Sequence, residues 1–286
     1  MKMISSLELL PKYEAESSWW EHVPLAHMLV EILRPETIVE LGTHYGVSLF
    51  SFCEAAENYS KGTYVYAVDT WSGDEQAGYY GDEVYRKVSE HREKYHKERC
   101  QLIKSTFDDA AKRFEDKSID IIHIDGLHTY EAVKADYDTW KNKVREGGSI
   151  LFHDWNVREG DFGVWKLWES IKQDEEYKCI EFPNGYGLGI ATACKVKPDW
   201  HRIIEENMRT LQCKGILLER INNAKRQIKH SESESMIREK HITNLEKITE
   251  DQRESIKIYE SKLRKKNNWM NRIYQKGKRI IERMKG

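Results

Sequence analysis

Two short polar clusters directly follow apolar segments in the middle of the chain, and their side chains can bind a metal ion or accept a proton. HIDGLHTY contains Asp125 and His128, and SILFHD ends with His153 and Asp154. Two carboxylates and an imidazole, on Asp125, His153 and Asp154, suffice to hold one divalent cation such as Mg²⁺. His128 can act as the base toward a substrate hydroxyl, because an ordinary imidazole pKa of about 6.5 suits that role at neutral pH. The alternative is structural: the acids cap loops or helices, and the histidines are hydrogen-bonded structural residues.

A glycine-containing turn, VELGTHYGVS, lies earlier in the chain. Gly42 and Gly46 permit a tight turn, and the helix that starts there offers free N–H donors. Glu40 beside the turn suits a cationic amino group better than a pyrophosphate, and Asp69 at the next strand end suits two ribose hydroxyls. This pattern favours S-adenosylmethionine over NAD, although an ordinary tight turn can contain the same glycines. The predicted residues of the binding site for S-adenosylmethionine are Glu40, Gly42, Thr43, Gly46, Ser48, Asp69, Thr70 and Asp125.

These residues are far apart in sequence, so a fold must bring them together. Residues 37–194 alternate β-rich and helical stretches. The pattern predicts an α/β, Rossmann-like domain with a mostly parallel, seven-stranded sheet that is covered on both faces. Because ligands gather beyond the carboxyl ends of parallel strands, both polar clusters and the glycine turn should face one crevice. The strands are expected at 37–41, 63–69, 100–104, 119–125, 149–154, 177–182 and 188–194, and a helix at 25–33 should precede them. Further helices are expected near 46–58, 82–97, 106–115, 129–144 and 163–173.

The character of the chain changes at about residue 199. Apolar residues then recur at heptad spacing, which predicts a helical hairpin or a coiled coil over 199–261 that could form a homo-oligomer. The first heptad position holds Ile221, Ile228, Ile242, Ile256, Leu263 and Met270, and the second holds Ala224, Leu245, Tyr259 and Ile273. The expected organisation is therefore a catalytic-type domain over 1–198, a helical segment over 199–261 and a basic helix over 262–286.

Charge is distributed unevenly along the 286 residues. Residues 262–286 contain ten Lys or Arg and one Glu, a local charge of +9 in a chain whose formal net charge is −2. Apolar residues interleave with these basic ones, which predicts an amphipathic helix that either lies on an anionic membrane surface or packs on the coiled coil. No recognised binding fold accompanies the basic patch, so nucleic acid is not an expected partner.

Other features of the composition suggest a cytoplasmic protein. No apolar run approaches the roughly 20 residues of a membrane-spanning helix, and the first residues lack the apolar stretch of an export signal. The five cysteines are odd in number, scattered and without a CxxC pair, which indicates reduced thiols rather than a zinc knuckle or a disulfide framework.

Five separated motifs resemble, in order, those of one methyltransferase family: IVELGTHYGVSLF, AVDTWSGDEQAGYYGDEVY, IDIIHIDGLHTYEAVKADYDTW, GGSILFHDWNVREGDFGVWKLWES and FPNGYGLGIA. This class I family includes cephalosporin-hydroxylase-like and macrolide-sugar O-methyltransferases, which are often joined to glycosyltransferases in bacterial surface-polysaccharide systems. The resemblance covers roughly residues 20–195. It implies contacts to S-adenosylmethionine at Glu40, Gly42 and Asp69, and a mobile lid over the substrate at 69–81.

The resemblance also assigns roles within the two polar clusters. It implies a metal ligand at Asp125 and a general base at His128. The acidic pair that completes the family's metal site falls on His153 and Asp154, so a histidine stands where the family has its first acid. Three alternatives follow: weak Mg²⁺ binding, preference for a more nitrogen-seeking ion such as Mn²⁺, or no metal.

The predicted activity is transfer of a methyl group from S-adenosylmethionine to a sugar hydroxyl of a glycan or glycolipid precursor. His128 or Asp125 would act as the base, and catalysis would come mainly from positioning. The alternative function is a catalytically idle methyltransferase fold that acts as a scaffold through its coiled-coil tail. An NAD-dependent oxidoreductase is disfavoured by the turn at 40–46.

Overall fold

The chain folds around one seven-stranded sheet in the computed structural model, which describes residues 11–76 and 78–283. The strand order is β5-β2-β1-β6-β7-β9-β8, and only β9 runs antiparallel to its neighbours. The strands are β1 (Thr37–Leu41), β2 (Tyr64–Asp69), β5 (Cys100–Lys104), β6 (Ile119–Ile124), β7 (Val144–His153), β8 (Tyr177–Phe182) and β9 (Leu188–Ala193). Five parallel strands followed by an antiparallel pair confirm the predicted Rossmann-like methyltransferase fold.

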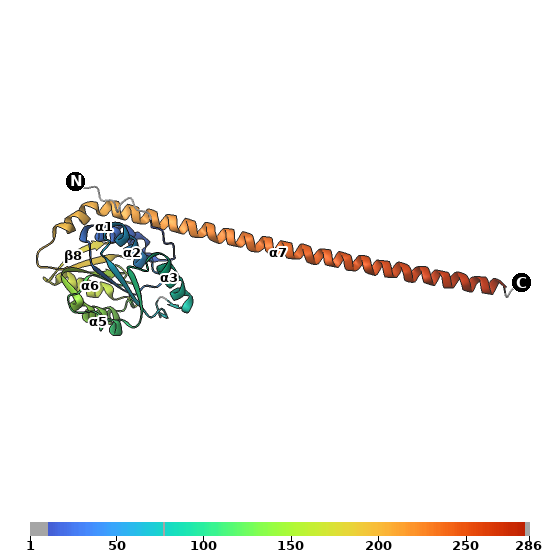
Figure 1. Ribbon diagram of the computed structural model, residues 1–286, viewed down its shortest axis with the longest axis horizontal. Coiled ribbons are helices and arrows are strands. Elements are labelled where there is room, and N and C mark those ends of the chain that lie inside the picture. The colour runs from blue at the N-terminus through green and yellow to red at the C-terminus, as the bar shows by residue number, and fades with distance from the viewer. Residues whose placement is uncertain (1–10, 77, 284–286) are drawn as a thin grey trace. The chain divides into compact units, whose positions relative to one another are not determined.

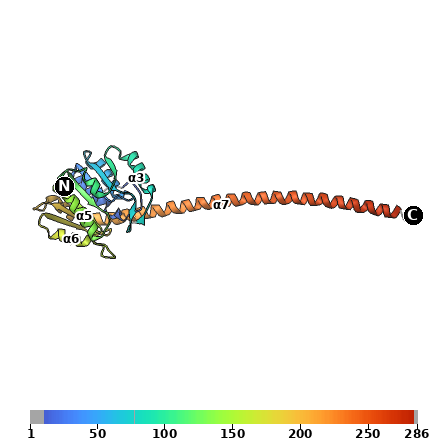
Figure 2. The ribbon, with the colours of Figure 1, turned by 90° about the horizontal axis from the view of Figure 1, so that it is seen from below.

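Helices cover both faces of the sheet, and each face has its own hydrophobic cluster. The helices before β8 are α1 (Val23–Leu33), α2 (Val47–Tyr59), α3 (Asp82–Tyr95), α4 (Phe107–Ala111), α5 (Tyr130–Trp140) and α6 (Val164–Gln173). Helices α1 and α2 supply one cluster, and α5 and α6 supply the other (Figures 1 and 2). The central strands β1 and β6 are buried on both faces, and their apolar runs are nearly continuous, as expected for a parallel sheet.

Two small elements were not predicted from the sequence. A 3₁₀-helix, η2 (Ser18–His22), precedes α1 and buries Trp19 and Trp20. A hairpin of β3 (Gly73–Asp74) and β4 (Gly78–Tyr79) follows β2, within the stretch expected to form a lid. Strands of two residues are too short to show an alternating pattern in sequence.

The C-terminal segment forms one continuous helix, α7 (Asp199–Arg283). The expected helix is confirmed, while the turn that a helical hairpin needs is absent between Asp199 and Arg283. The chain divides into two compact units after Asn223. In the first unit, Ile204, Leu211 and Leu218 of α7 are buried in the same core as α1 and α2.

In the second unit, the described apolar side chains of α7 are exposed to solvent. They include Ile228, Met236, Ile237, Ile242, Leu245 and Ile248. The structure does not describe the side chains at the remaining predicted heptad positions, from Ile256 onward, or the basic side chains of 262–286. Among the helices that the structure describes, none combines the length and the apolar character needed to cross a membrane.

Candidate active site

The candidate site lies at the carboxyl ends of β1, β2, β6 and β7, which neighbour one another in the sheet and run parallel. The glycine turn after β1 packs directly on the end of β6. Gly42 has a φ of +87°, and a Cβ atom there would lie 2.0 Å from the carbonyl oxygen of Asp125. Only glycine therefore permits this approach, and Gly42 holds the predicted donor-binding turn against the first polar cluster.

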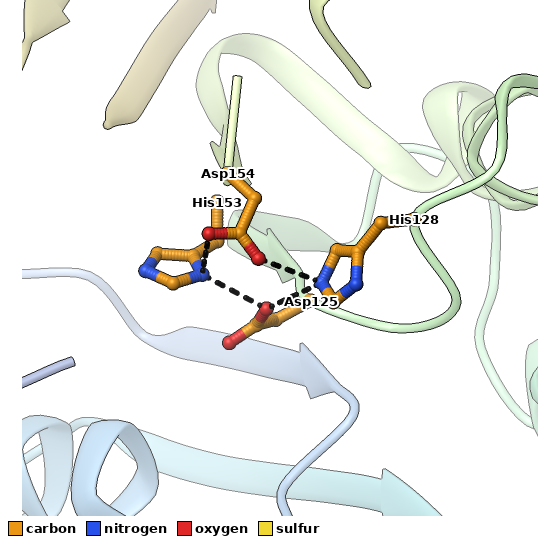
Figure 3. A group of neighbouring side chains, drawn as sticks. All are labelled: Asp125, His128, His153 and Asp154. Carbon is orange, nitrogen blue, oxygen red and sulfur yellow. Dashed lines mark hydrogen bonds and ion pairs between the residues drawn. The ribbon is translucent and has the colours of Figure 1, made fainter. Parts of the chain in front are cut away.

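Three non-glycine residues at these strand ends have left-handed backbone conformations. His44 has a φ of +48°, Trp71 of +49° and Asp154 of +59°. Such conformations cost free energy and concentrate where a site requires a particular side-chain direction. Asp154 immediately follows β7, and its carboxylate points toward His128 and His153 (Figure 3).

Asp125, His128, His153 and Asp154 form one compact cluster, as the sequence predicted (Figure 3). The Nε2 atom of His128 lies 3.3 Å from Asp125 Oδ1 and 3.0 Å from Asp154 Oδ2. The Nδ1 atom of His153 lies 3.1 Å from Asp125 Oδ1 and 3.3 Å from Asp154 Oδ1. Each imidazole therefore bridges the same two carboxylates.

The proximity of opposite charges shifts the pKa values of both histidines upward. Burial alone would lower the pKa of His128, but its interactions with Asp125 and Asp154 outweigh burial and raise the pKa to about 9. Burial likewise disfavours charge on His153, yet the same carboxylates hold its pKa well above the usual value. The pKa of His128 therefore lies above the ordinary imidazole value, because two carboxylates face one ring nitrogen.

The two carboxyl groups shift in the opposite direction. Burial would raise the pKa of Asp125, but His153 and His128 hold it well below its usual range. For Asp154 burial also opposes ionisation, and the same two histidines still lower the pKa to about 2. The opposite shifts in pKa follow from one cause, because the imidazolium and carboxylate forms of these four side chains stabilise one another.

The same side chains fit a divalent cation. Their donor atoms all lie within 4.8 Å of one another, and the closest pairs are 3.0–3.3 Å apart. Metal–ligand bonds of about 2.1 Å place neighbouring ligands roughly 3 Å apart, so the spacing matches a coordination shell. Two carboxylates suit Mg²⁺, whereas the imidazole of His153 shifts the preference toward Mn²⁺ or Zn²⁺. An ion bound by His153 would need that ring nitrogen without a proton, so the affinity for the ion should rise with pH.

Glu40 lies behind the cluster, fully buried at the end of β1. Its Oε2 atom accepts a hydrogen bond from His123 Nδ1 at 3.2 Å. His123 Nε2 accepts one from the indole N–H of Trp19 at 3.1 Å, which places the ring proton on Nδ1. The Oε1 atom of Glu40 has no hydrogen-bond partner among the described residues, so a carboxylate oxygen remains for the donor's ammonium group. That contact stays a prediction.

Asp69 holds the glycine turn in place. Its Oδ2 atom accepts from the backbone N–H groups of Thr43 and His44 at 2.8 and 3.0 Å, and Oδ1 accepts from the N–H of Trp71 at 2.7 Å. Only Oδ1 keeps spare acceptor capacity, so the predicted bond to ribose hydroxyls depends on that atom.

The other residues predicted to bind the donor also lie at these strand ends. Thr43 is buried, and its hydroxyl has no partner among the described residues. Ser48 is buried and bonds to the carboxylate of Glu40, whereas Thr70 is exposed. Gly46 adopts a φ of +82° as the N-cap of α2.

Three residues of this region were missed at the sequence level. Trp19 and His123 orient Glu40, and Gln76 bonds to His128. The partners are separated by 104, 83 and 52 positions, so no local pattern could have paired them. Gln76 could have been considered from the sequence, because it lies in the stretch expected to form a lid over the substrate.

Residues 39–155 match a protein-family model described as a methyltransferase domain. The matched region includes the glycine turn, Asp69 and the whole four-residue cluster. Among curated proteins, the chain is 43% identical over 178 residues to an uncharacterized protein, y4gI, of Sinorhizobium fredii. That match covers 62% of this chain and 19% of the relative, so the chain spans about a fifth of the relative's length.

Two solved structures are similar to this chain at lower sequence identity than that relative. One is an O-methyltransferase from Bacillus cereus in complex with SAH, with 16% identity, a TM-score of 0.47 and coverage of 66% of this chain and 90% of that chain. The other is the SAH-bound methyltransferase PaMTH1 from Podospora anserina, with 15% identity, a TM-score of 0.47 and coverage of 63% and 88%. Both TM-scores are below 0.5, so these similarities support no conclusion about the chemistry of this chain.

Proposed function

We propose that this protein is an S-adenosylmethionine-dependent O-methyltransferase that methylates a sugar hydroxyl of a glycan or glycolipid precursor. The observation that carries the proposal is the position of His128 and Asp125, directly beside the glycine turn at the strand ends. A base beside a donor-binding turn is what methyl transfer to a hydroxyl requires. The methyltransferase-domain match over 39–155 covers the same residues.

The reaction needs one nucleophilic displacement and one proton transfer. The acceptor oxygen attacks the methyl carbon of the sulfonium, and the carbon–sulfur bond breaks with its electron pair kept by sulfur. The products are the methyl ether and S-adenosylhomocysteine, and the hydroxyl proton passes to Nε2 of His128. Asp125 and Asp154 stabilise the imidazolium that forms, because both lie within 3.3 Å of this nitrogen.

His128 must lose its own proton before it can act as the base, since its pKa is raised to about 9. The positive charge of the bound sulfonium favours this loss. A divalent cation held by Asp125, His153 and Asp154 would orient the acceptor oxygen and neutralise the carboxylates that keep His128 protonated.

The proposed sugar acceptor is supported by the family resemblance and by aromatic residues near the site. Tyr79 of β4 is 76% exposed, an unusual position for an aromatic ring, and Tyr80 stacks on His44 of the glycine turn with ring centroids 5.1 Å apart. Exposed aromatic rings provide flat apolar surfaces against which a sugar ring can pack.

The test is transfer of a labelled methyl group from S-adenosylmethionine to a panel of sugar and lipid-linked sugar acceptors. Wild-type protein should label at least one acceptor, and Asp125→Ala should reduce the rate at least about 100-fold, because the base His128 loses a carboxylate that stabilises its imidazolium. Labelling of no acceptor by folded wild-type protein would contradict the proposal and support the scaffold alternative. Equal rates for wild type and Asp125→Ala would contradict the role of the cluster.

A further inference from the structure

The side chain of Gln76, in the hairpin of β3 and β4, contacts the candidate active site at His128. Its Oε1 atom lies 2.9 Å from the backbone nitrogen of His128 and 3.0 Å from Nδ1 of the same residue. Its Nε2 atom lies 2.8 Å from Asp161 Oδ1 in the loop between β7 and α6. Gln76 thus joins three separate segments of the chain, the hairpin, the loop before α5 and the loop before α6.

The chemistry of these partners determines which way the amide of Gln76 points. The backbone N–H of His128 can only donate, and the ionised carboxylate of Asp161 can only accept. The amide oxygen must therefore face His128, and the amide nitrogen must face Asp161. An oxygen in that position can only accept, so the ring nitrogen beside it, Nδ1 of His128, must carry a proton.

Because Nδ1 carries that proton, Nε2 is the ring nitrogen of His128 that can accept another. Nε2 is the atom that faces Asp125 and Asp154, at 3.3 and 3.0 Å. The plane of the ring is also constrained, because Phe162 stacks on it with an interplanar angle of 3° and a centroid distance of 5.0 Å. The backbone carbonyl of His128 accepts from the N–H of Gly163 at 2.7 Å. The His128 ring therefore has a fixed position, and its Nδ1 atom is fixed as a hydrogen-bond donor.

We propose that Gln76 is a positioning residue, which orients His128 so that Nε2 receives the proton of the acceptor hydroxyl. This inference rests on the proposed methyl-transfer function. A hydrogen bond to the second ring nitrogen is the usual way in which a protein sets which nitrogen of a histidine is available for proton transfer. The competing explanation is that Gln76 only fastens the hairpin to the loop containing Asp161.

Three variants separate positioning from fastening. Gln76→Leu keeps the bulk of the side chain and removes both polar contacts. Asp161→Ala removes the contact that fastens the hairpin and leaves the acceptor to His128 in place. The double variant Gln76→Glu with Asp161→Asn restores both contacts with the two polar groups exchanged. A carboxylate oxygen at position 76 then faces His128, and the amide at position 161 donates to the same carboxylate.

The first measurement is steady-state methyl transfer by the full-length protein. Gln76→Leu should lower kcat about 10- to 100-fold, within the contribution of a positioned base, and should leave KM for S-adenosylmethionine within about twofold of wild type. Asp161→Ala should keep kcat near wild type, and the double variant should recover most of the activity. Wild-type kcat in Gln76→Leu, or an equal loss in Asp161→Ala, would overturn the proposal.

The second measurement does not depend on turnover. In protein labelled with ¹⁵N-histidine, the ring Nδ1–H of His128 should give a protected NMR signal, identified by its absence in His128→Gln. The signal should disappear in Gln76→Leu and return in the double variant. Its persistence in Gln76→Leu would overturn the proposal. If wild-type protein methylates no acceptor, the proposed function fails, while this signal still decides whether Gln76 holds His128.

Discussion

At the scale of single residues, the metal preference of the proposed site should depend on His153. Its Nδ1 atom occupies a place beside Asp125 and Asp154 where a carboxylate would give an all-oxygen set. Mg²⁺ strongly favours oxygen ligands, whereas Mn²⁺ and Zn²⁺ accept imidazole readily. The side chain is also buried, so solvent cannot substitute for a poorly matched ligand.

Replacing His153 by aspartate should therefore change metal selectivity. In His153→Asp the ratio of Mg²⁺ affinity to Mn²⁺ affinity should rise about tenfold, equivalent to about 1.4 kcal/mol. Competition between the two ions, followed by the EPR signal of free Mn²⁺, measures the ratio directly. An unchanged ratio in a variant with wild-type circular dichroism would show that His153 does not coordinate the ion.

His27 is a second residue with a measurable consequence, this time for stability. It is buried in α1, and neither ring nitrogen has a hydrogen-bond partner among the described residues. Burial lowers its pKa to about 3, and Lys214 adds to the effect. The folded state therefore resists protonation that the unfolded chain accepts at about pH 6.5, so stability is lost as the pH falls from about 6.5 toward 3.

His27→Leu should remove this loss. At pH 7 the variant should be as stable as wild type or more stable, because an unpartnered buried polar group is replaced by an apolar one. From pH 6.5 to pH 5 the wild-type free energy of unfolding should fall by about 1.6 kcal/mol in total more than that of the variant. Urea denaturation across this range tests the difference, and parallel pH profiles would contradict it.

At the scale of elements, the turn between β1 and α2 connects the residues predicted to bind the methyl donor with the cluster of Asp125, His128, His153 and Asp154. Asp69 fixes the turn through two of its backbone N–H groups, those of Thr43 and His44, and Gly42 allows the turn to touch the end of β6. The segment before η2 approaches it from the other side, where the hydroxyl of Tyr13 donates to the carbonyl of Tyr45 at 2.5 Å. Small changes in this turn should therefore affect both the fold and the site.

Gly42→Ala should destabilise the protein by about 3 kcal/mol or more, since the new Cβ would collide with Asp125 and the φ is unfavourable for alanine. Gly62→Ala is the matched control, because a Cβ there meets nothing within 4 Å. Its effect should be within about 0.5 kcal/mol. Thermal or urea unfolding of both variants measures the contrast, and equal stabilities would refute the argument from close approach.

The main elements could be predicted from sequence because their signals are local. Each of the seven strands contains an apolar run bounded by turn residues, and β1, β5 and β8 begin and end where expected. Strand β7 begins at Val144, before its expected start at residue 149, because pairing with β6 extends it across a charged, glycine-containing stretch. That extension depends on a neighbouring strand and has no local signal.

The cluster was predictable for a similar reason, because Asp125, His128, His153 and Asp154 adjoin the ends of two neighbouring parallel strands. What the sequence could not supply were contacts between distant segments. The bond from Trp19 to His123, the hydrogen bond from Gln76 to His128 and the contribution of Asp154 to the raised pKa of His128 all depend on side chains far apart in sequence.

At the scale of the whole molecule, the chain combines a compact unit up to Asn223 with a second unit that consists of the remaining part of α7. Exposed apolar side chains such as Ile228, Ile242 and Leu245 are compatible with the predicted coiled-coil association, which stays a prediction. The net charge of +9 over 262–286 motivates the separate prediction of a membrane-surface contact.

Deletion of residues 262–286 should release the protein from anionic liposomes, because each basic residue contributes about 1 kcal/mol at such a surface. The affinity for S-adenosylmethionine should stay unchanged, since the proposed site lies within 40–154. Co-sedimentation with liposomes of defined charge measures the first effect. Equal binding by the full-length and shortened proteins would exclude the membrane contact.

The central claim, that the strand ends form a binding site for S-adenosylmethionine, is tested most directly by isothermal titration calorimetry of the full-length protein. The account predicts saturable binding of one S-adenosylmethionine per chain and no binding of NADH. Folded protein that gives no binding heat with S-adenosylmethionine at several temperatures would contradict the account.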